Sequence, residues 1–249
     1  MMRIKLIRRF FIVLIWILIW QTASMLTGLE LLLASPVTVL RTLFEMLTTW
    51  DFYKTLLHSL CNIGGGFFIG LAIGIILGML AGKIKIFEEF IALPLQLMKS
   101  LPVAAFVILL LMWFGSKKVS TIITAMVVIP MITNGVREGI RNTDRKLMEF
   151  AKVYRMKKIN QVRYIFFPES YPYVVSQLKM SLGMCFKAGI SAEVIGLVSN
   201  TIGTSMYYAK IYLLSAELFA WSLVVIVVSA LFEKIVLALS KGLYLLLSR

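Results

Sequence analysis

Long apolar stretches separated by short polar segments dominate the hydrophobic pattern of this chain. A membrane-spanning helix needs ~20 mostly apolar residues, because ~30 Å of hydrocarbon is crossed at ~1.5 Å per residue. The third stretch contains Pro94, Lys99 and Pro102, which are tolerated at membrane depth only where protein or a water-filled cavity satisfies the freed polar groups. The pattern predicts an all-α membrane protein with six transmembrane helices, at residues 10–27, 59–82, 90–115, 119–135, 173–197 and 218–239.

The N-terminal region allows two interpretations. Four basic residues precede the first apolar run, which is compatible with a signal peptide cleaved near residues 22–24. Two tryptophans within the run, and the further spans that follow, favour an uncleaved first helix. Residues 29–59 carry scattered charges and Pro36, and predict an amphipathic segment at the far interface. We therefore expect an N-terminal helix and interfacial segment over residues 1–54.

Composition removes several classes of function. The chain is 60% hydrophobic and 15% charged, whereas soluble domains carry about 25% charged residues, so no hydrophilic block remains for a soluble catalytic domain. The net charge of +14 could indicate nucleic-acid binding. Retention of basic loops in the cytoplasm explains that charge better, because no basic soluble module is present.

Reactive side chains are sparse. Cys61 and Cys185 both fall in apolar segments, and the single histidine, His58, has no cysteine or histidine nearby. Neither a disulfide framework nor a metal site is indicated. The sequence also lacks a phosphate-binding loop and a histidine-based acid–base set. We expect a subunit without catalytic residues and without a cofactor.

Basic residues are distributed unevenly over the loops. Nine lysines and arginines lie between Arg137 and Arg163, and four more precede the first span. The loops on the other side carry only Lys117 and Lys118 in one case and Lys210 in another. The positive-inside rule and the even number of spans place both termini, and the basic segment, in the cytoplasm.

The second span contains a glycine at every fourth position. Such a row of missing side chains lets two membrane helices approach closely. We interpret the row as a packing seam without chemistry; its members are Gly66, Gly70, Gly74, Gly78 and Gly82.

Ionisable residues inside the predicted spans are candidates for a polar pathway. They are Lys99, Lys179, Lys187 and Glu193. Lys187 and Glu193 are separated by about 600° of helical rotation, so they lie on different faces and a direct pair is not expected. One interpretation is a polar lining in which Lys187 favours an anion. The other is that Lys179 snorkels to the interface and Lys187 pairs with another span.

Residues 149–170 form a basic, amphipathic stretch inside an otherwise apolar chain. Helical spacing is visible over residues 147–155 and 159–167, with a turn at residues 156–158. Ile159, Val162 and Phe166 share one face, which a solvated loop would not need. A helix-turn-helix of this kind suits docking into a groove of another protein; the alternative is an amphipathic helix on anionic lipid.

The stretch from Glu149 to Pro168 resembles the EAA loop in the permeases of type I binding-protein-dependent ABC importers. That family reads Glu-Ala-Ala, three residues, Gly, and later Pro at the spacing found here. Glu149, Ala151 and Pro168 stand in place, whereas Phe150 replaces the first alanine and Arg155 the glycine. Without that glycine, a neighbouring residue could adopt the positive φ of the turn.

Further segments extend the resemblance over nearly the whole chain. "ASPVTVLRTL", "SLPVAAFVILLLMWFG" and "LKMSLGMCFKAGISAEVIGLVSNTIG" are similar to successive parts of the family's permease domain. The detailed likeness is to the subgroup that imports sulfonates, nitrate, taurine and pyrimidine thiamine precursors. Lys187 sits where that subgroup is usually uncharged, so the substrate class does not transfer directly.

The resemblance implies an assembly. Two permease subunits, here a homodimer, would form the path across a bacterial plasma membrane, each docked to an ATPase subunit and served by an extracytoplasmic solute-binding protein. The transmembrane domain would cover residues 55–242, with a cytoplasmic tail at residues 243–249. A gradient-driven carrier or channel without an ATPase is the alternative. The implied docking residues are Glu149, Ala151, Tyr154, Arg155, Ile159 and Pro168, and the implied pathway residues are Pro102, Lys187 and Glu193.

Overall fold

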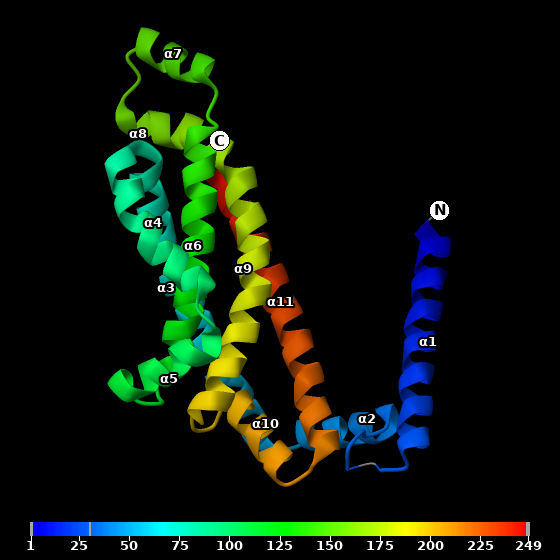
Figure 1. Cartoon of the computed structure of the whole chain (residues 1–249). Coiled ribbons are helices and arrows are strands. Elements are labelled where there is room, and N and C mark those ends of the chain that lie inside the picture. Colours follow the sequence, from blue (N-terminus) through cyan, green and yellow to red (C-terminus); the bar gives the residue numbers. More distant parts are fainter. Residues whose placement is uncertain (1, 30, 248–249) are drawn as a thin grey trace.

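The computed structural model describes residues 2–29 and 31–247, and these residues form helices and connecting turns. Figure 1 shows their arrangement. The helices are α1 (Met2–Thr27), α2 (Pro36–Leu47), α3 (Trp50–Lys83), α4 (Lys85–Ser100), α5 (Val103–Phe114), α6 (Val119–Arg141), α7 (Arg145–Val153), α8 (Lys158–Gln161), the π-helical turn η1 (Val162–Phe166), α9 (Phe167–Gly196), α10 (Ile202–Ile211) and α11 (Ser215–Leu247).

The long helices run roughly side by side and the short ones gather at the two ends (Figure 1). α7 and α8 stand beyond the upper end of the bundle, close to the C-terminus, whereas α2, α5 and α10 lie at the lower end. α1 stands apart from the bundle and joins it at the lower end through α2. There the ring of Trp20 lies 5.5 Å from that of Phe219 on α11.

Three helices are long and apolar enough to cross a membrane, namely α3, α6 and α11. α4 and α5 together form a fourth candidate, bent by 105°. The apolar run Phe11–Thr27 of α1 is shorter. α9 carries Lys179, Lys187 and Glu193 along its length and is not among the candidates. The described residues thus give three to four clear spans.

The predicted interfacial segment divides into two parts. Ser35 caps α2 by accepting a hydrogen bond from the backbone N–H of Thr38, 3.2 Å away, and Pro36 occupies the first turn, where its missing N–H costs nothing. After Thr48 and Thr49 the chain enters α3 at Trp50, nine residues before the predicted start of the second span. Residues 50–58, which were predicted to lie in the interfacial segment, therefore belong to α3.

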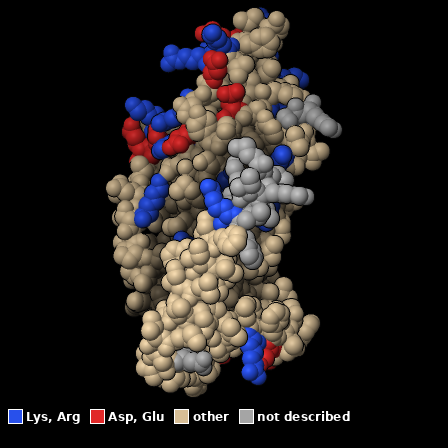
Figure 2. Space-filling model, turned by 90° about the vertical axis from the view of Figure 1, so that its right-hand side faces the viewer, with Lys and Arg blue, Asp and Glu red and all other residues tan. Residues whose placement is uncertain are grey.

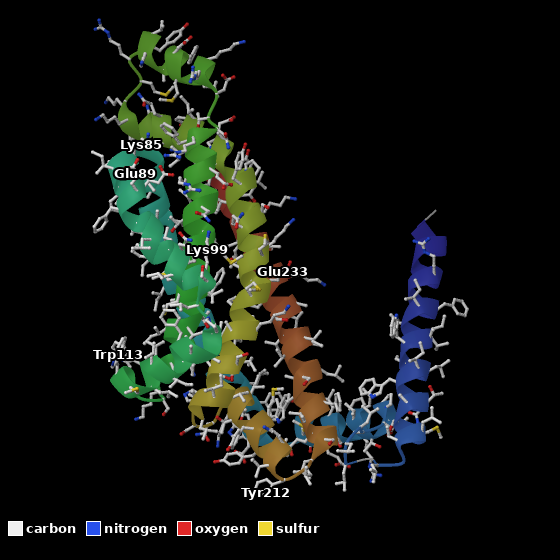
Figure 3. All side chains as sticks on the ribbon, in the orientation of Figure 1. Lys85, Glu89, Lys99, Trp113, Tyr212 and Glu233 are labelled. Carbon is white, nitrogen blue, oxygen red and sulfur yellow. The ribbon has the colours of Figure 1, made fainter. Side chains whose placement is uncertain are left out.

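The third predicted span breaks at one proline and not at the other. Pro94 lies inside α4, whereas Leu101 and Pro102 are extended and separate α4 from α5. Pro102 fixes φ near −59° and disfavours a helical conformation at Leu101, which explains the break there. Lys99, one turn before the break, points away from the α4 ribbon near the middle height of the bundle (Figure 3).

The fifth predicted span begins earlier than its apolar residues suggest. α9 starts at Phe167 and follows η1 without a break, so Pro168 lies in the first turn of a helix. The N–H of Phe167 donates to the carbonyl of Val162, five residues back. A π turn widens the helix at this point, and such turns accommodate a ring that would otherwise strike the preceding carbonyl.

The glycine row of α3 packs directly against α6, which confirms the predicted seam. A β-carbon on Gly70 would lie 2.8 Å from Cβ of Val128, and one on Gly74 would lie 2.8 Å from Cβ of Ile132. Carbonyl oxygens of α6 lie at 2.9 and 3.0 Å from the same two positions. The neighbouring atoms are β-carbons and backbone carbonyls of α6, which cannot move aside, so only glycine allows the two helices to lie this close.

An ion-pair cluster joins α4 to the upper end of α6. Glu88 accepts from Arg137, 3.2 Å away, and also from Arg141. Charged side chains gather over the upper part of the molecule, whereas most of the lower surface visible in Figure 2 is uncharged. At the opposite end, Trp113 of α5 and Tyr212 after α10 are exposed (Figure 3). Aromatic residues at that level are typical of a membrane–water interface.

Candidate functional site

The α7–α8 hairpin, residues 145–161, is the first candidate site. Asp144 caps α7 by accepting from the N–H of Lys146 at 2.9 Å. The helix ends at Val153, and the N–H of Met156 donates back to the carbonyl of Ala151 at 2.9 Å. The side chain of Gln161 then donates to the carbonyl of Met156, also at 2.9 Å. Local hydrogen bonds therefore hold the two helices in a defined turn.

Arg155 adopts the left-handed conformation in this turn, with φ of +47°. The sequence interpretation left the positive φ to a neighbour, but the structure assigns it to Arg155 itself. The position is the one at which the resembling family has glycine. An L-residue in this region costs ~1–2 kcal/mol relative to its preferred conformations, so the hairpin carries a local strain that its hydrogen bonds offset.

We expect Arg155→Gly to stabilise the turn by ~1 kcal/mol, because glycine adopts positive φ without the steric cost of a β-carbon. Slower hydrogen exchange of the Met156 amide would report this. Lys157→Gly is the matched control, since Lys157 is also basic but has φ of −58°. Faster exchange in both variants would contradict a left-handed Arg155.

The outer surface of the hairpin is apolar and aromatic. Phe150 and Tyr154 are exposed by 52% and 68%, and their ring centroids lie 4.3 Å apart. Ile159 on α8 is 75% exposed. Glu149 is exposed beside them, whereas Ala151 is buried. The arrangement offers aromatic side chains and one carboxylate outward.

The second candidate is an exposed row along α9. Lys179, Gly183, Lys187 and Ser191 recur at every fourth position and are all exposed. The face about 100° away from this row is occupied, because Ala188 and Ala192 pack against Val107 and Leu110 of α5. A row with two ammonium groups, a glycine and a hydroxyl forms a polar stripe on the exposed side of the helix. The four-residue spacing was visible in the sequence, but only Lys179 and Lys187 were recognised.

Glu193 lies elsewhere, fully buried at the lower end of the bundle. Its carboxylate accepts from Ser59 Oγ of α3 at 2.7 Å, from Ser120 Oγ of α6 at 3.4 Å and from the N–H of Gly203 in α10 at 3.2 Å. Ser59 Oγ in turn accepts from the N–H of Ile202 at 2.8 Å. We call these four residues and Ile202 the Glu193 cluster.

The Glu193 cluster fastens α10 to three long helices. A β-carbon at position 203 would lie 2.6 Å from the backbone nitrogen of Val194 and closer still to Cβ of Glu193, so Gly203 permits the contact. Sequence reasoning found Glu193 but missed both serines and Gly203. The available signal was a single serine near the start of each of two apolar spans, but nothing in the sequence connects these serines with Glu193.

The predicted site residues therefore separate into three places. The hairpin collects Glu149, Ala151, Tyr154, Arg155 and Ile159, and Pro168 follows it in the first turn of α9. Lys187 lies on the exposed row and Pro102 at the α4–α5 break, while Glu193 is buried among its hydrogen-bond partners. Among the described residues no group of three or more His, Cys, Asp or Glu could hold a metal ion.

The described residues form a bundle with three to four helices of membrane-spanning length, from which a short, capped hairpin projects at one end (Figure 1). The family model described as "Binding-protein-dependent transport system inner membrane component" matches residues 70–243. The chain belongs to this family.

Relatives and solved structures agree with the family. The chain is 29% identical over 230 residues to the putative aliphatic sulfonates transport permease protein SsuC of Bacillus subtilis, covering 91% of this chain and 83% of that protein. It is 26% identical over 163 residues to the bicarbonate transport system permease protein CmpB of Synechococcus elongatus, covering 65% and 57%. The fold matches a MetNI methionine ABC transporter structure with a TM-score of 0.53, 15% identity and coverage of 79% and 94%.

Proposed function

We propose that this chain is the permease subunit of an ATP-driven, binding-protein-dependent importer of a small solute. The observation that carries the proposal is the exposed α7–α8 hairpin within a chain that belongs to the importer permease family. In this function the permease hydrolyses nothing, and an ATPase subunit docks against the hairpin. An extracytoplasmic binding protein delivers the solute at the opposite end.

The proposal fixes a topology. α1, α3, the α4–α5 pair, α6, α9 and α11 would be the six spans, with the hairpin and both termini on the cytoplasmic side of a bacterial plasma membrane. The charge gathered at the hairpin end supports this orientation, because basic segments are retained in the cytoplasm. Two copies of the chain would enclose the path, with Pro102 and the exposed row of α9 on its walls.

Docking is proposed to use the outer surface of the hairpin. Phe150, Tyr154 and Ile159 would enter a groove of the ATPase, and Glu149 would meet a basic residue there. Ala151 is buried and would act indirectly, by setting how α7 packs on the turn. ATP-driven closure of two ATPase subunits would then move the hairpins and, through η1 and α9, the membrane helices.

The test is reconstitution with the ATPase and binding protein encoded beside the gene. Wild-type permease is expected to co-purify with the ATPase and to support ATP hydrolysis stimulated by solute and binding protein in liposomes. Glu149→Lys is expected to lower that stimulation at least tenfold, which corresponds to ~1.4 kcal/mol of lost coupling, because it reverses the charge in the docking surface. Glu89→Lys, the same change at an exposed glutamate of α4 outside the hairpin, is the control.

Intact assembly and stimulation in Glu149→Lys would contradict docking through this surface. Transport that proceeds without any ATPase, driven by an ion gradient, would favour a carrier instead. Loss of stimulation in both variants would indicate a general folding defect, so protein yield and monodispersity are measured alongside. The two variants together therefore separate docking from folding.

The solute is proposed to be a small anion. SsuC and CmpB are named for sulfonates and bicarbonate, which are both anions. Lys187 supports the same class, because its side chain is exposed in the proposed path and has no ion-pair partner among the described residues. A neutral or cationic precursor of thiamine is the competing class, and the lysine would disfavour a cation.

Lys187→Gln is expected to lower the initial rate of uptake of the anion by about tenfold, because a partly dehydrated ammonium within ~4 Å attracts an anion by several RT. The affinity of the binding protein for the anion should not change. Lys210→Gln, at an exposed lysine of α10, is the matched control. Uptake that is equal in the two variants would remove Lys187 from the path.

A further inference from the structure

A cavity of about 150 Å³ lies between α3, α6, η1 and α9, just below the hairpin. Its walls are almost entirely apolar, and include Ile75, Met79, Val136, Phe166 and Val174. Met79 and Val162, which also lines it, are each 39% exposed, so the cavity is not closed off from the outside of the bundle. An apolar cavity of this size accommodates apolar groups.

A single cation stands at the upper end of the cavity. Lys83, in the last turn of α3, lines it and places Nζ 5.5 Å from the centre of the Phe166 ring. The Lys83 side chain is exposed and forms no ion pair with any described carboxylate. A positive charge above an apolar chamber is complementary to a molecule with an anionic head and an apolar tail.

The lining below Lys83 is apolar. Ser170 follows Phe166 by one helical turn, ~6 Å further into the bundle, but its hydroxyl is buried against Gly139 of α6 and is not part of the cavity surface. Ile75 lies eight residues before Lys83 on α3, ~12 Å deeper. The cavity thus presents one ammonium at its upper end and apolar surface below it.

We propose that the cavity binds part of one acyl chain of an anionic phospholipid, with the headgroup phosphate at Lys83. The leaflet would be the cytoplasmic one if the topology proposed above holds; the binding itself depends on neither the ATPase nor the solute. Because η1 and Phe166 form one wall, the bound lipid would brace the junction between the hairpin and α9.

The test uses the full-length chain purified in detergent and mixed with phosphatidylglycerol or phosphatidylcholine of identical acyl chains. Native mass spectrometry measures the number of bound lipids and their apparent Kd. Wild-type protein is expected to retain one phosphatidylglycerol about fivefold more tightly than phosphatidylcholine, the effect of one lysine near an anionic headgroup. Lys83→Gln should remove that preference. Lys85→Gln, at an exposed lysine two residues on that does not line the cavity, should keep it.

The proposal would be overturned if the wild type bound the two lipids equally, or if both variants lost the preference for phosphatidylglycerol to the same extent. Either result would indicate diffuse attraction to a basic surface. A second measurement locates the tail. Phosphatidylglycerol with a photoreactive acyl chain should label peptides within residues 71–83 and 162–174. Labelling confined to other helices would also overturn it. So would a crosslinking experiment in which a photoreactive group at position 79 captures a second copy of the chain in place of lipid. Neither outcome bears on import, which is measured by uptake.

Discussion

Replacing Gly70 and Gly74 of α3 together by alanine is expected to lower the free energy of unfolding by ~2–6 kcal/mol relative to a control pair. The new β-carbons would come within 2.8 Å of Val128 Cβ and Ile132 Cβ, and within 2.9 and 3.0 Å of carbonyl oxygens of α6. Neither neighbour is the end of a flexible side chain, so the strain cannot be relieved by a rotamer change. The two helices would have to separate along the seam.

The control pair is Gly65→Ala with Gly183→Ala. Both positions are helical, and a β-carbon there meets nothing within 4 Å. Alanine improves helix propensity by up to ~1 kcal/mol at each site, and this gain applies equally to both pairs. Unfolding by denaturant in mixed micelles, followed by tryptophan fluorescence, gives the difference. If the two double variants unfolded at the same denaturant concentration, the close packing of α3 on α6 would be wrong.

The second large effect is expected at Glu193, where Glu193→Ala should cost ~2–4 kcal/mol. The change leaves the N–H of Gly203 and the hydroxyl of Ser59 without their acceptor, and each buried unsatisfied donor costs ~1–3 kcal/mol. The space vacated by the side chain adds a cavity term. Glu193→Gln keeps one oxygen at the same place and should cost about half as much. Thermal unfolding in detergent measures both.

A local measurement distinguishes a role in fastening α10 from a general loss of stability. Hydrogen exchange at the Ile202 and Gly203 amides should accelerate in Glu193→Ala and in Ser59→Ala, because these amides donate to the Glu193 cluster. The double variant should lose less than the sum of the two, since both side chains serve one network. Additive effects, or unchanged exchange in α10, would show that the cluster does not hold this helix.

The spans and the hairpin show how much of the fold can be predicted from the sequence. Apolar length located α3, α6 and α11, since burial in lipid is a property of a segment and can be counted along the chain. Helical spacing also located α7 and the turn after it, to within a few residues. It failed at helix ends that carry polar residues, as at Trp50 and Phe167, where α3 and α9 begin well before the apolar core of each span.

Backbone geometry was harder to anticipate than helix location. Of the two prolines in the third predicted span, Pro94 stays inside α4, whereas Pro102 marks the break before α5. Both prolines impose the same local restriction, so whether the helix breaks at one or the other depends on which of the freed carbonyls the neighbouring helices can accommodate. Arg155 is a similar case, because its positive φ is held by the hydrogen bonds of Met156 and Gln161 around it.

The sequence by itself determined that this is a helical membrane protein, that α3 has a seam for close packing, and that a basic amphipathic hairpin interrupts the spans. Each of these is a periodic or compositional property of a continuous segment. Only the tertiary structure decided that Glu193 is a buried acceptor for Ser59, Ser120 and Gly203, that Lys187 is exposed on a polar row, and that Lys83 stands over an apolar cavity. Ser59 and Glu193 are 134 residues apart, and their contact is fixed by the distances and crossing angles of packed helices, which no local pattern encodes.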